Sequence, residues 1–253
     1  MRRIQALALA CLAAVAPAAA AETPPPLVYG YVQLMSNYIG RGLSQSVGKP
    51  SLQAEVDVNP GNGPYLNLGI VRIAWIGKLD PGTRADVEVD GVVGWRRLFG
   101  EDGEFRFGVL RMQFPGHYGA GMVRPDTTEV FALVGAGGAS ARLNVDVTDS
   151  FGTPGSRGSW YLDTNFTRAI DPRWRVSLHA GRRELRGRDP ATGEPYARRS
   201  SYTDLKAGLA RTLGEHASLT AAWSWTTAKS VNYTLDGYDV SGTQFALVYE
   251  YDF

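Results

Sequence analysis

The last segment of the sequence constrains the fold most, because two kinds of side chain alternate along it without a break. One set is mostly apolar and aromatic, and the set between is small, polar or charged: Thr243, Phe245, Leu247, Tyr249, Tyr251 and Phe253 against Gln244, Ala246, Val248, Glu250 and Asp252. Successive side chains of a β-strand point to opposite faces. The segment is therefore predicted to be a strand with one apolar face, and helical spacing does not fit it.

The same period of two recurs along the chain. Val87, Val89, Val93 and Trp95, for example, oppose Asp86, Glu88 and Asp90. About twelve such strands are expected, centred near Val32, Val56, Leu68, Val89, Phe107, Val130, Val145, Leu162, Val176, Leu205, Leu219 and Leu247. The pattern predicts an all-β fold built as one domain.

Two architectures fit alternating strands. A soluble sandwich buries its apolar faces, whereas a membrane barrel turns them to lipid and its polar faces to the lumen. Rows of charges on the polar faces favour the barrel. So do aromatic residues near predicted strand ends, where an interfacial girdle would sit: Trp75, Trp95, Trp160, Trp174, Trp225 and Tyr251. We therefore predict a closed antiparallel transmembrane β-barrel of about 12 strands.

The predicted connectors alternate in length. Short turns are expected at 59–63, 100–103, 135–139, 170–172 and 213–215, and longer connections at 39–48, 77–83, 115–125, 150–158, 184–199 and 227–241. Barrels of the bacterial outer membrane have short periplasmic turns and longer extracellular loops. An even number of strands would place both termini in the periplasm.

The first 21 residues have the pattern of a cleaved secretory signal. Arg2 and Arg3 precede an apolar run, and Ala19 and Ala21 form a small-x-small cleavage pattern. A polar, proline-rich periplasmic lead-in at 22–26 and the barrel at 27–253 follow. The chain's single cysteine, Cys11, lies in the signal. The mature chain is thus expected to form no disulfide and no thiolate metal site.

Charge and hydropathy exclude other classes of protein. The chain has 26 Lys and Arg against 25 Asp and Glu, so it lacks the basic excess of a nucleic-acid binder. After the signal, no apolar run is long enough for a membrane helix. The bacterial outer membrane is the expected location, with lipid and lipopolysaccharide as surroundings. Phe253, an aromatic residue at the end of the last strand, is predicted to be the insertion signal that the barrel assembly machinery reads.

One stretch resembles a known family. The residues concerned are Ser36-Asn37-Tyr38-Ile39-Gly40-Arg41-Gly42-Leu43-Ser44-Gln45-Ser46, followed by Pro50, Leu52 and Gln53. They are similar to the opening of the TorF-family porins, with Arg41, Gly42, Ser44 and Gln45 as the loop motif. Tyr161-Leu162-Asp163 and Tyr202-Thr203-Asp204-Leu205-Lys206 resemble that family's later strands. The resemblance implies an outer-membrane barrel with a diffusion role.

A porin requires a wetted lumen and charges along its bore. The candidate pore-lining residues are Glu55, Asp57, Asp86, Glu88, Asp90, Glu129, Arg142, Asp146, Asp163, Arg173, Arg175, Asp204, Lys206 and Glu250. These charges either set up a field across an open bore or pair and hold a filled lumen together. Twelve strands lie between filled eight-stranded barrels and open sixteen-stranded porins, so both states stay open at this point.

Two basic features have a functional and a structural interpretation. Arg41 either projects into the mouth to meet anions or caps carbonyl groups of a tight loop. The arginine-rich loop between Arg182 and Arg199 either binds lipopolysaccharide phosphates, which the guanidinium fork matches, or is an ordinary solvated loop. Acidic residues within that loop partly neutralise it.

A lipid-hydrolysing barrel is the enzymatic alternative. The sequence has three histidines, His117, His179 and His216, and no G-x-S-x-G elbow. His179 is predicted to point inward, whereas a lipid-acting triad would face lipid near the rim. Neither zinc-binding nor EF-hand spacing is present. We therefore expect no enzyme, cofactor or metal. The leading function is passive diffusion of small hydrophilic solutes, and the alternative is a structural or lipopolysaccharide-binding barrel with a filled lumen.

Overall fold

The computed structural model describes residues 27–253, so the predicted signal peptide (1–21) and lead-in (22–26) lie outside the described residues. The wall strands are β1 (Val28–Met35), β4 (Ser51–Val58), β5 (Gly63–Arg72), β6 (Val87–Phe99), β7 (Gly103–Gln113), β8 (Thr127–Ala136), β9 (Ala139–Asp146), β10 (Trp160–Ala169), β11 (Trp174–Glu184), β12 (Tyr202–Thr212), β13 (Ala217–Thr226) and β16 (Gln244–Asp252). The connections contain β2 (Ile39–Gly40), β3 (Leu43–Ser44), β14 (Thr234–Leu235), β15 (Tyr238–Asp239), the helices α1 (Trp75–Leu79) and α2 (Ala197–Ser200), and the 3₁₀ turns η1 (Ser150–Gly152) and η2 (Ser230–Asn232).

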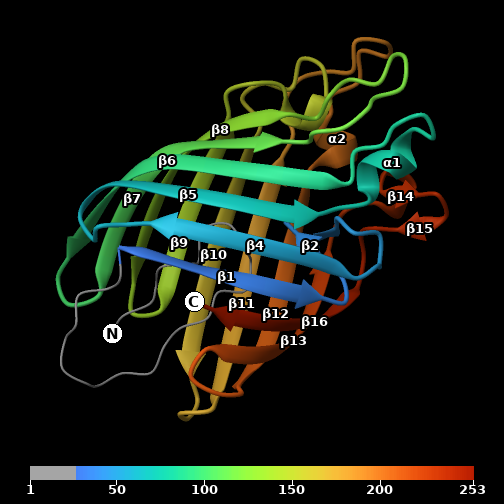
Figure 1. Cartoon of the computed structure of the whole chain (residues 1–253). Coiled ribbons are helices and arrows are strands. Elements are labelled where there is room, and N and C mark those ends of the chain that lie inside the picture. Colours follow the sequence, from blue (N-terminus) through green and yellow to red (C-terminus); the bar gives the residue numbers. More distant parts are fainter. Residues whose placement is uncertain (1–26) are drawn as a thin grey trace.

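The wall strands pair antiparallel in sequence order, and β1 closes the sheet against β16 (Figure 1). Within residues 27–253 this makes a closed barrel of twelve strands, which confirms the predicted fold class. Every predicted strand centre, from Val32 to Leu247, falls in a wall strand. At the closing seam Val32 pairs with Tyr251, so the apolar outer face continues across it. Closure leaves the wall without a free edge.

The two faces of the wall reverse the burial of a water-soluble protein. Apolar side chains point outward and are exposed: Phe245 by 69%, Val93 by 66% and Leu247 by 55%. Charged side chains point inward and are buried, and Glu129 and Asp146 are 0% and 1% exposed. An apolar exterior with a polar interior is the arrangement of a barrel surrounded by lipid chains. It is the arrangement that the alternating pattern predicted.

The connections differ in length at the two ends of the barrel. Short turns join β4 to β5, β6 to β7, β8 to β9, β10 to β11 and β12 to β13. The opposite end carries the long connections, where α1, α2 and the β14–β15 hairpin gather (Figure 1). Both helices are short, and no helix between residues 27 and 253 combines the length and the apolar character that a membrane span requires.

An apolar cluster fills part of the lumen below the long connections. Ile76 of α1 and Phe114 are fully buried in it, and Leu110 and Met112 reach it from β7. Trp75, which the sequence placed in an interfacial girdle, instead packs edge-on against Phe114 with ring centroids 5.7 Å apart. The girdle assignment of Trp75 is therefore wrong. The residue belongs to α1, which folds over the lumen, and not to the end of a wall strand.

Candidate functional site

The first long connection folds into the lumen and crosses it. Its hairpin, β2–β3, lies against the inner face of the wall on one side, where the Tyr202 hydroxyl donates to the Arg41 carbonyl at 2.9 Å. Gly42 packs directly on Asp204 and Thr226 of the same wall, so closely that a Cβ would collide with both. The hairpin thus constricts the barrel from within.

Arg41 ties this hairpin to the opposite wall. Both terminal nitrogens of its guanidinium donate to the two carboxylate oxygens of Glu129 on β8, each at 2.7 Å. The guanidinium carbon also lies 4.9 Å from the ring centroid of Tyr161, in cation–π range. Burial alone would lower the pKa of the Arg41 guanidinium, yet the adjacent Glu129 carboxylate holds that pKa well above its usual range. Arg41 therefore stays charged inside the lumen.

The side chain of Arg41 binds a carboxylate of the wall and not the carbonyl groups of its own loop. Its contact with solute anions stays a prediction. The main-chain φ of Arg41 is 49°, in the left-handed region that costs a residue with a Cβ about 1 kcal/mol. The neighbouring Gly42, at φ 77°, adopts the same region without that cost. The Arg-Gly pair of the loop motif thus forms the tip of the hairpin.

A second arginine lies beside the constriction. Arg183 of β11 donates to Asp146 of β9 at 2.6 Å and also to the Ser150 hydroxyl in η1. Its guanidinium carbon lies 5.8 Å from the ring centroid of Phe151. The sequence predicts Arg183 only as part of the external arginine-rich loop. Arg183 lies two residues after Gly181 on β11, so the two share the inward face of the strand. This alternation could have predicted that Arg183 points into the lumen.

His179 lies at the centre of a buried network that includes Asp204, the residue on which Gly42 of the hairpin packs. Its Nε2 is 2.8 Å from an Asp204 oxygen and 3.1 Å from the Tyr161 hydroxyl, and its Nδ1 is 3.2 Å from Asp163. His179 points inward as predicted. A catalytic group for lipid substrates would face the outside of the barrel, so the position of this network argues against a lipid hydrolase.

The half of the lumen nearest the short turns is lined by paired polar groups. Glu104 accepts from both Arg96 and Arg106 at 2.9 Å. Glu55 accepts from the Tyr31 hydroxyl at 2.6 Å and from Asn67 at 2.7 Å. Arg96, Glu104 and Arg106 are not among the predicted pore-lining residues, although they alternate with Trp95, Phe105 and Phe107 in the sequence. The pairs narrow the bore on this side of the hairpin.

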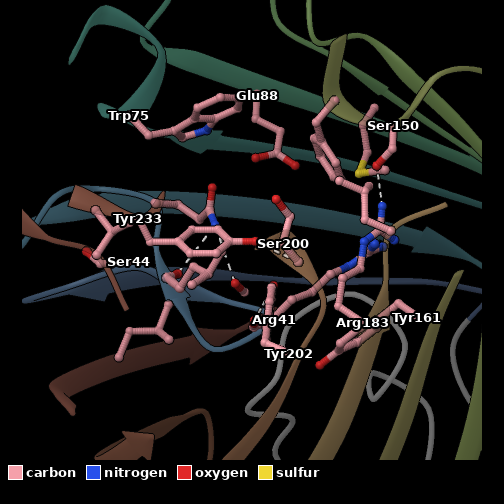
Figure 2. Close-up of a pocket in the computed structure, with 18 of the residues that line it drawn as sticks. Arg41, Ser44, Trp75, Glu88, Ser150, Tyr161, Arg183, Ser200, Tyr202 and Tyr233 are labelled. Atoms are coloured by element: carbon pink, nitrogen blue, oxygen red, sulfur yellow. Dashed lines mark hydrogen bonds between the residues drawn. The ribbon is translucent and has the colours of Figure 1, made fainter. Parts of the chain in front are cut away.

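A cavity of about 400 Å³ lies on the long-connection side of the lumen. It is lined by the hairpin, α1, η1 and the wall, with Arg41, Arg183, Trp75 and Tyr202 among the lining side chains (Figure 2). Tyr233 of the last long connection also lines it, and burial raises the pKa of Tyr233 to about 12. Its volume and mixed polar and aromatic lining are those of a small-molecule site.

The fourteen predicted pore-lining residues fall into three groups. Those buried on the inward face are Glu55, Asp57, Glu88, Glu129, Arg142, Asp146, Asp163, Asp204, Lys206 and Glu250. Asp90 and Arg175 are half-buried, and Asp86 and Arg173 are exposed. The last two precede β6 and β11, so they lie at the ends of wall strands, and their assignment to the bore stays a prediction. In both cases the alternation in the sequence continues to the residue just before the first residue of the strand.

Among the described residues, no group of His, Cys, Asp and Glu side chains could hold a metal ion.

The residues of the predicted loop motif make several different contacts. Ser44 donates to the Asn37 side chain at 2.6 Å, and the Gln45 carbonyl accepts from the amides of Ala74 and Trp75 at 2.9 and 3.2 Å. Ser44 and Gln45 therefore hold the hairpin in place, and Arg41 alone reaches across the lumen.

Comparison with known proteins agrees with the barrel. One similar solved structure is a KdgM porin in complex with disordered oligogalacturonate, at 7% identity and a TM-score of 0.51, covering 89% of this chain and 98% of that one. Another is a NanC porin, at 9% identity and a TM-score of 0.51, covering 88% and 97%. At such identities the likeness concerns the fold alone.

No curated protein matches the sequence significantly. The resemblance to TorF-family porins stays a prediction, because the family model that matches carries another description. That model is of bacterial proteins of unknown function, called Gcw_chp, and it spans residues 18–250. With nearly the whole barrel inside that range, the chain belongs to the Gcw_chp family of bacterial proteins of unknown function.

Proposed function

We propose that the protein is an outer-membrane channel of narrow bore through which small hydrophilic solutes diffuse. The observation that carries the proposal is the reversed burial of the wall, with charged residues such as Glu88 and Arg142 inside and exposed Val93 and Phe245 outside. Such a wall fits a barrel with lipid outside and water inside. The fold shared with the KdgM and NanC porins supports the same function.

The proposed orientation follows from the connections. The short turns, together with the start of β1 and the end of β16, would face the periplasm, and the long connections the outside. A solute would then enter through the cavity and meet the hairpin that Arg41 and Glu129 hold across the lumen. The bore at this level is narrow, so small hydrated ions and solutes are the expected cargo.

Planar-bilayer recording of the refolded protein tests this function. We expect small, regular conductance steps, since the hairpin and the paired charges restrict the bore. Heat-modifiable migration in gel electrophoresis would show independently that the barrel is folded. A folded barrel that gives no step would overturn the proposal of a channel.

Charge reversal tests whether the inward carboxylates border the path. Glu88→Lys together with Asp90→Lys should shift the reversal potential in a salt gradient toward anions, because two negative charges of the lumen become positive. The matched control is Glu101→Lys, which changes an exposed residue of a short turn and should leave selectivity unchanged. An unchanged reversal potential in the folded double variant would contradict the proposed path.

A filled barrel that binds the surrounding lipid is the second candidate, and one observation favours it. Paired side chains close around Glu104 and Glu55 in the half of the lumen near the short turns. The external arginine-rich connection, with exposed Arg186, Arg188 and Arg198, would then meet lipopolysaccharide phosphates. Absence of conductance, combined with binding of purified lipopolysaccharide that these three arginines control, would favour this candidate over the channel.

A further inference from the structure

Two carboxylates on β6 line the cavity without a cationic partner of their own, and we propose that they bind the ammonium group of a small organic amine. Glu88 and Asp90 are two residues apart on one strand, so their side chains share the inward face. Figure 2 shows the Glu88 carboxylate directed into the cavity. The proposed ligand carries one positive charge and an apolar body.

Glu88 is buried without a protein partner. Glu88 is 7% exposed. The described part of the chain shows no hydrogen bond or short ion pair to the Glu88 carboxylate. One oxygen of Asp90, Oδ1, is also buried and lacks a hydrogen-bond partner among the protein atoms described. Buried carboxylates are normally paired or hydrogen-bonded, because burial of an unpaired charge costs several kcal/mol. A ligand cation would remove that cost.

The neighbours of the pair across the sheet are apolar. Across the sheet, Glu88 pairs with Val71 of β5, and Asp90 pairs with Met112 of β7. Leu110 of β7, which is 2% exposed, lines the same cavity. None of these neighbours can donate a hydrogen bond to a carboxylate through its side chain. The side chains across the sheet therefore leave room for a donor that a ligand in the cavity brings.

Three arginines line the cavity and each has another partner; the Arg142 Nε donates to the Asn144 side chain at 2.7 Å. Both terminal nitrogens of Arg41 bind Glu129, and Arg183 binds Asp146 and Ser150. The charge that Glu88 and Asp90 place on the cavity is thus not cancelled by a short ion pair. An ammonium ion suits such a site, since it brings three donors on a single atom.

The rest of the cavity defines the body of the ligand. Leu79, Leu110 and Leu185 line it together with Trp75, so apolar and aromatic contact is available next to the carboxylates. A volume of about 400 Å³ admits a molecule the size of an arylalkylamine. The apolar and aromatic side chains beside the two carboxylates fit the body of an organic cation, and no group of three or more His, Cys, Asp or Glu side chains among the described residues could hold a metal ion.

This inference goes beyond the channel, because the cavity and its carboxylates are present whether or not the bore conducts. Isothermal titration of the refolded full chain in detergent micelles tests it, with three probes of similar shape. We expect 2-phenylethylamine to bind with one site per chain, and the neutral 2-phenylethanol and the anionic 3-phenylpropionate to bind at least tenfold more weakly. Empty micelles correct for partition into detergent.

Two variants locate the site. Glu88→Gln and Asp90→Asn keep the side-chain shape, and each should weaken binding of 2-phenylethylamine at least tenfold. Glu101→Gln, an exposed residue on the short-turn side, should bind as the parent chain does. Equal affinity for the alcohol and the amine, or unchanged affinity in both cavity variants, would overturn the proposal. Tighter binding of the zwitterion phenylalanine than of the amine would overturn the class of ligand. The conductance of the same preparation reports separately on the channel.

Discussion

At the scale of single residues, Arg41 does two things that oppose each other energetically. Its backbone lies in the left-handed region, which is unfavourable for any residue with a Cβ, and its side chain forms a bidentate ion pair with a fully buried carboxylate. The charge-assisted pair offsets the backbone cost because both oxygens of Glu129 are satisfied at once. Glu129 depends on Arg41 more than Arg41 depends on Glu129, since the arginine is 20% exposed and the glutamate 0%.

Removal of the Arg41 side chain should destabilise the barrel. Arg41→Ala leaves Glu129 buried without its cation, which is expected to lower the free energy of unfolding by about 3 kcal/mol. Arg41→Lys keeps the charge but loses the planar fork, so its loss should be smaller. Urea-induced unfolding in lipid vesicles, followed by tryptophan fluorescence, measures both.

Arg97→Ala is the matched control for Arg41→Ala, because Arg97 is exposed. It should change the free energy of unfolding by less than about 0.5 kcal/mol. If Arg41→Ala and Arg97→Ala lowered stability equally, the ion pair across the lumen would not contribute to the fold as described.

At the scale of elements, the β2–β3 hairpin depends on one glycine that fits the wall. Gly42→Ala adds a Cβ at φ 77° that collides with Asp204 and Thr226. We expect a loss of about 3 kcal/mol, from backbone strain and overpacking together. Gly61→Ala is the control, since φ there is 94° and nothing lies within 4 Å of the added Cβ. It should cost only the strain of about 1 kcal/mol.

The two glycine variants also differ in what they do to the bore. Displacement of the hairpin by Gly42→Ala should increase single-channel conductance, whereas Gly61→Ala, in a short turn, should leave it unchanged. Equal unfolding free energies and equal conductances for the two variants would show that the hairpin does not pack as the structure places it.

The β14–β15 hairpin is attached to α1 by a contact that depends on pH. Lys78 of α1 hydrogen-bonds Asp236 at the hairpin turn and lowers the pKa of that carboxyl. Because the folded pKa lies below the unfolded one, the contact stabilises the hairpin at neutral pH. The stabilisation is lost as pH falls below about 4, where Asp236 takes up its proton.

Hydrogen exchange of residues 230–240 as a function of pH measures this effect, after correction for the intrinsic exchange rate. Protection should decline below about pH 4 in the parent chain. Lys78→Ala should show the low protection at every pH, and Lys229→Ala, which leaves the Lys78–Asp236 pair intact, should behave as the parent does. Identical profiles in all three proteins would contradict the role of this pair.

The wall and the connections differ in how far the sequence predicts them. Each wall strand repeats a local rule, so all twelve centres were predictable from the period of two. The hairpin is different, because Arg41 and Glu129 lie 88 residues apart and meet only if a loop turns inward. No local pattern encodes that turn. The prediction that Trp75 lies in an interfacial girdle was wrong for the same reason. Its place inside the lumen follows from α1, which folds over the mouth of the barrel.

Within the candidate site, the same limit separates predicted from missed residues. Inward carboxylates such as Glu88 and Asp163 followed from alternation. Alternation does not predict which charged side chains pair with one another. The pairing of His179 with Asp204 and of Arg183 with Asp146 depends on strand register and barrel curvature. Asp86 and Arg173 fall just before the first residues of β6 and β11, because alternation says nothing about where a strand begins.

At the scale of the whole molecule, the seam between β1 and β16 closes the wall. Phe253 is central to it: its amide donates to the Gly30 carbonyl at 2.9 Å, and the Gly30 amide donates to its carbonyl at 3.0 Å. Its ring lies over Gly30, where a Cβ would come within 2.8 Å of it. The residue proposed as the insertion signal thus also completes the last pair of the seam.

Deletion and substitution of Phe253 should therefore have different effects. Phe253→Ala removes the ring and keeps both backbone hydrogen bonds, so the refolded barrel should retain most of its stability. Deletion of Phe253 also removes those two bonds and should lower the yield of heat-modifiable barrel in refolding and in cells. Full assembly of the deletion variant would show that neither the seam nor the assembly machinery needs this residue.

The crossing of the lumen by the Arg41 hairpin has a consequence for the order of folding. A strand of this wall cannot enter lipid alone without taking its inward charges with it, so the strands must enter the bilayer together. The hairpin can lie across the lumen only once β8 and β12 have curved round to face each other. We therefore expect the contact between Arg41 and Glu129 to form late in folding, after the wall has closed, and to stabilise the closed barrel.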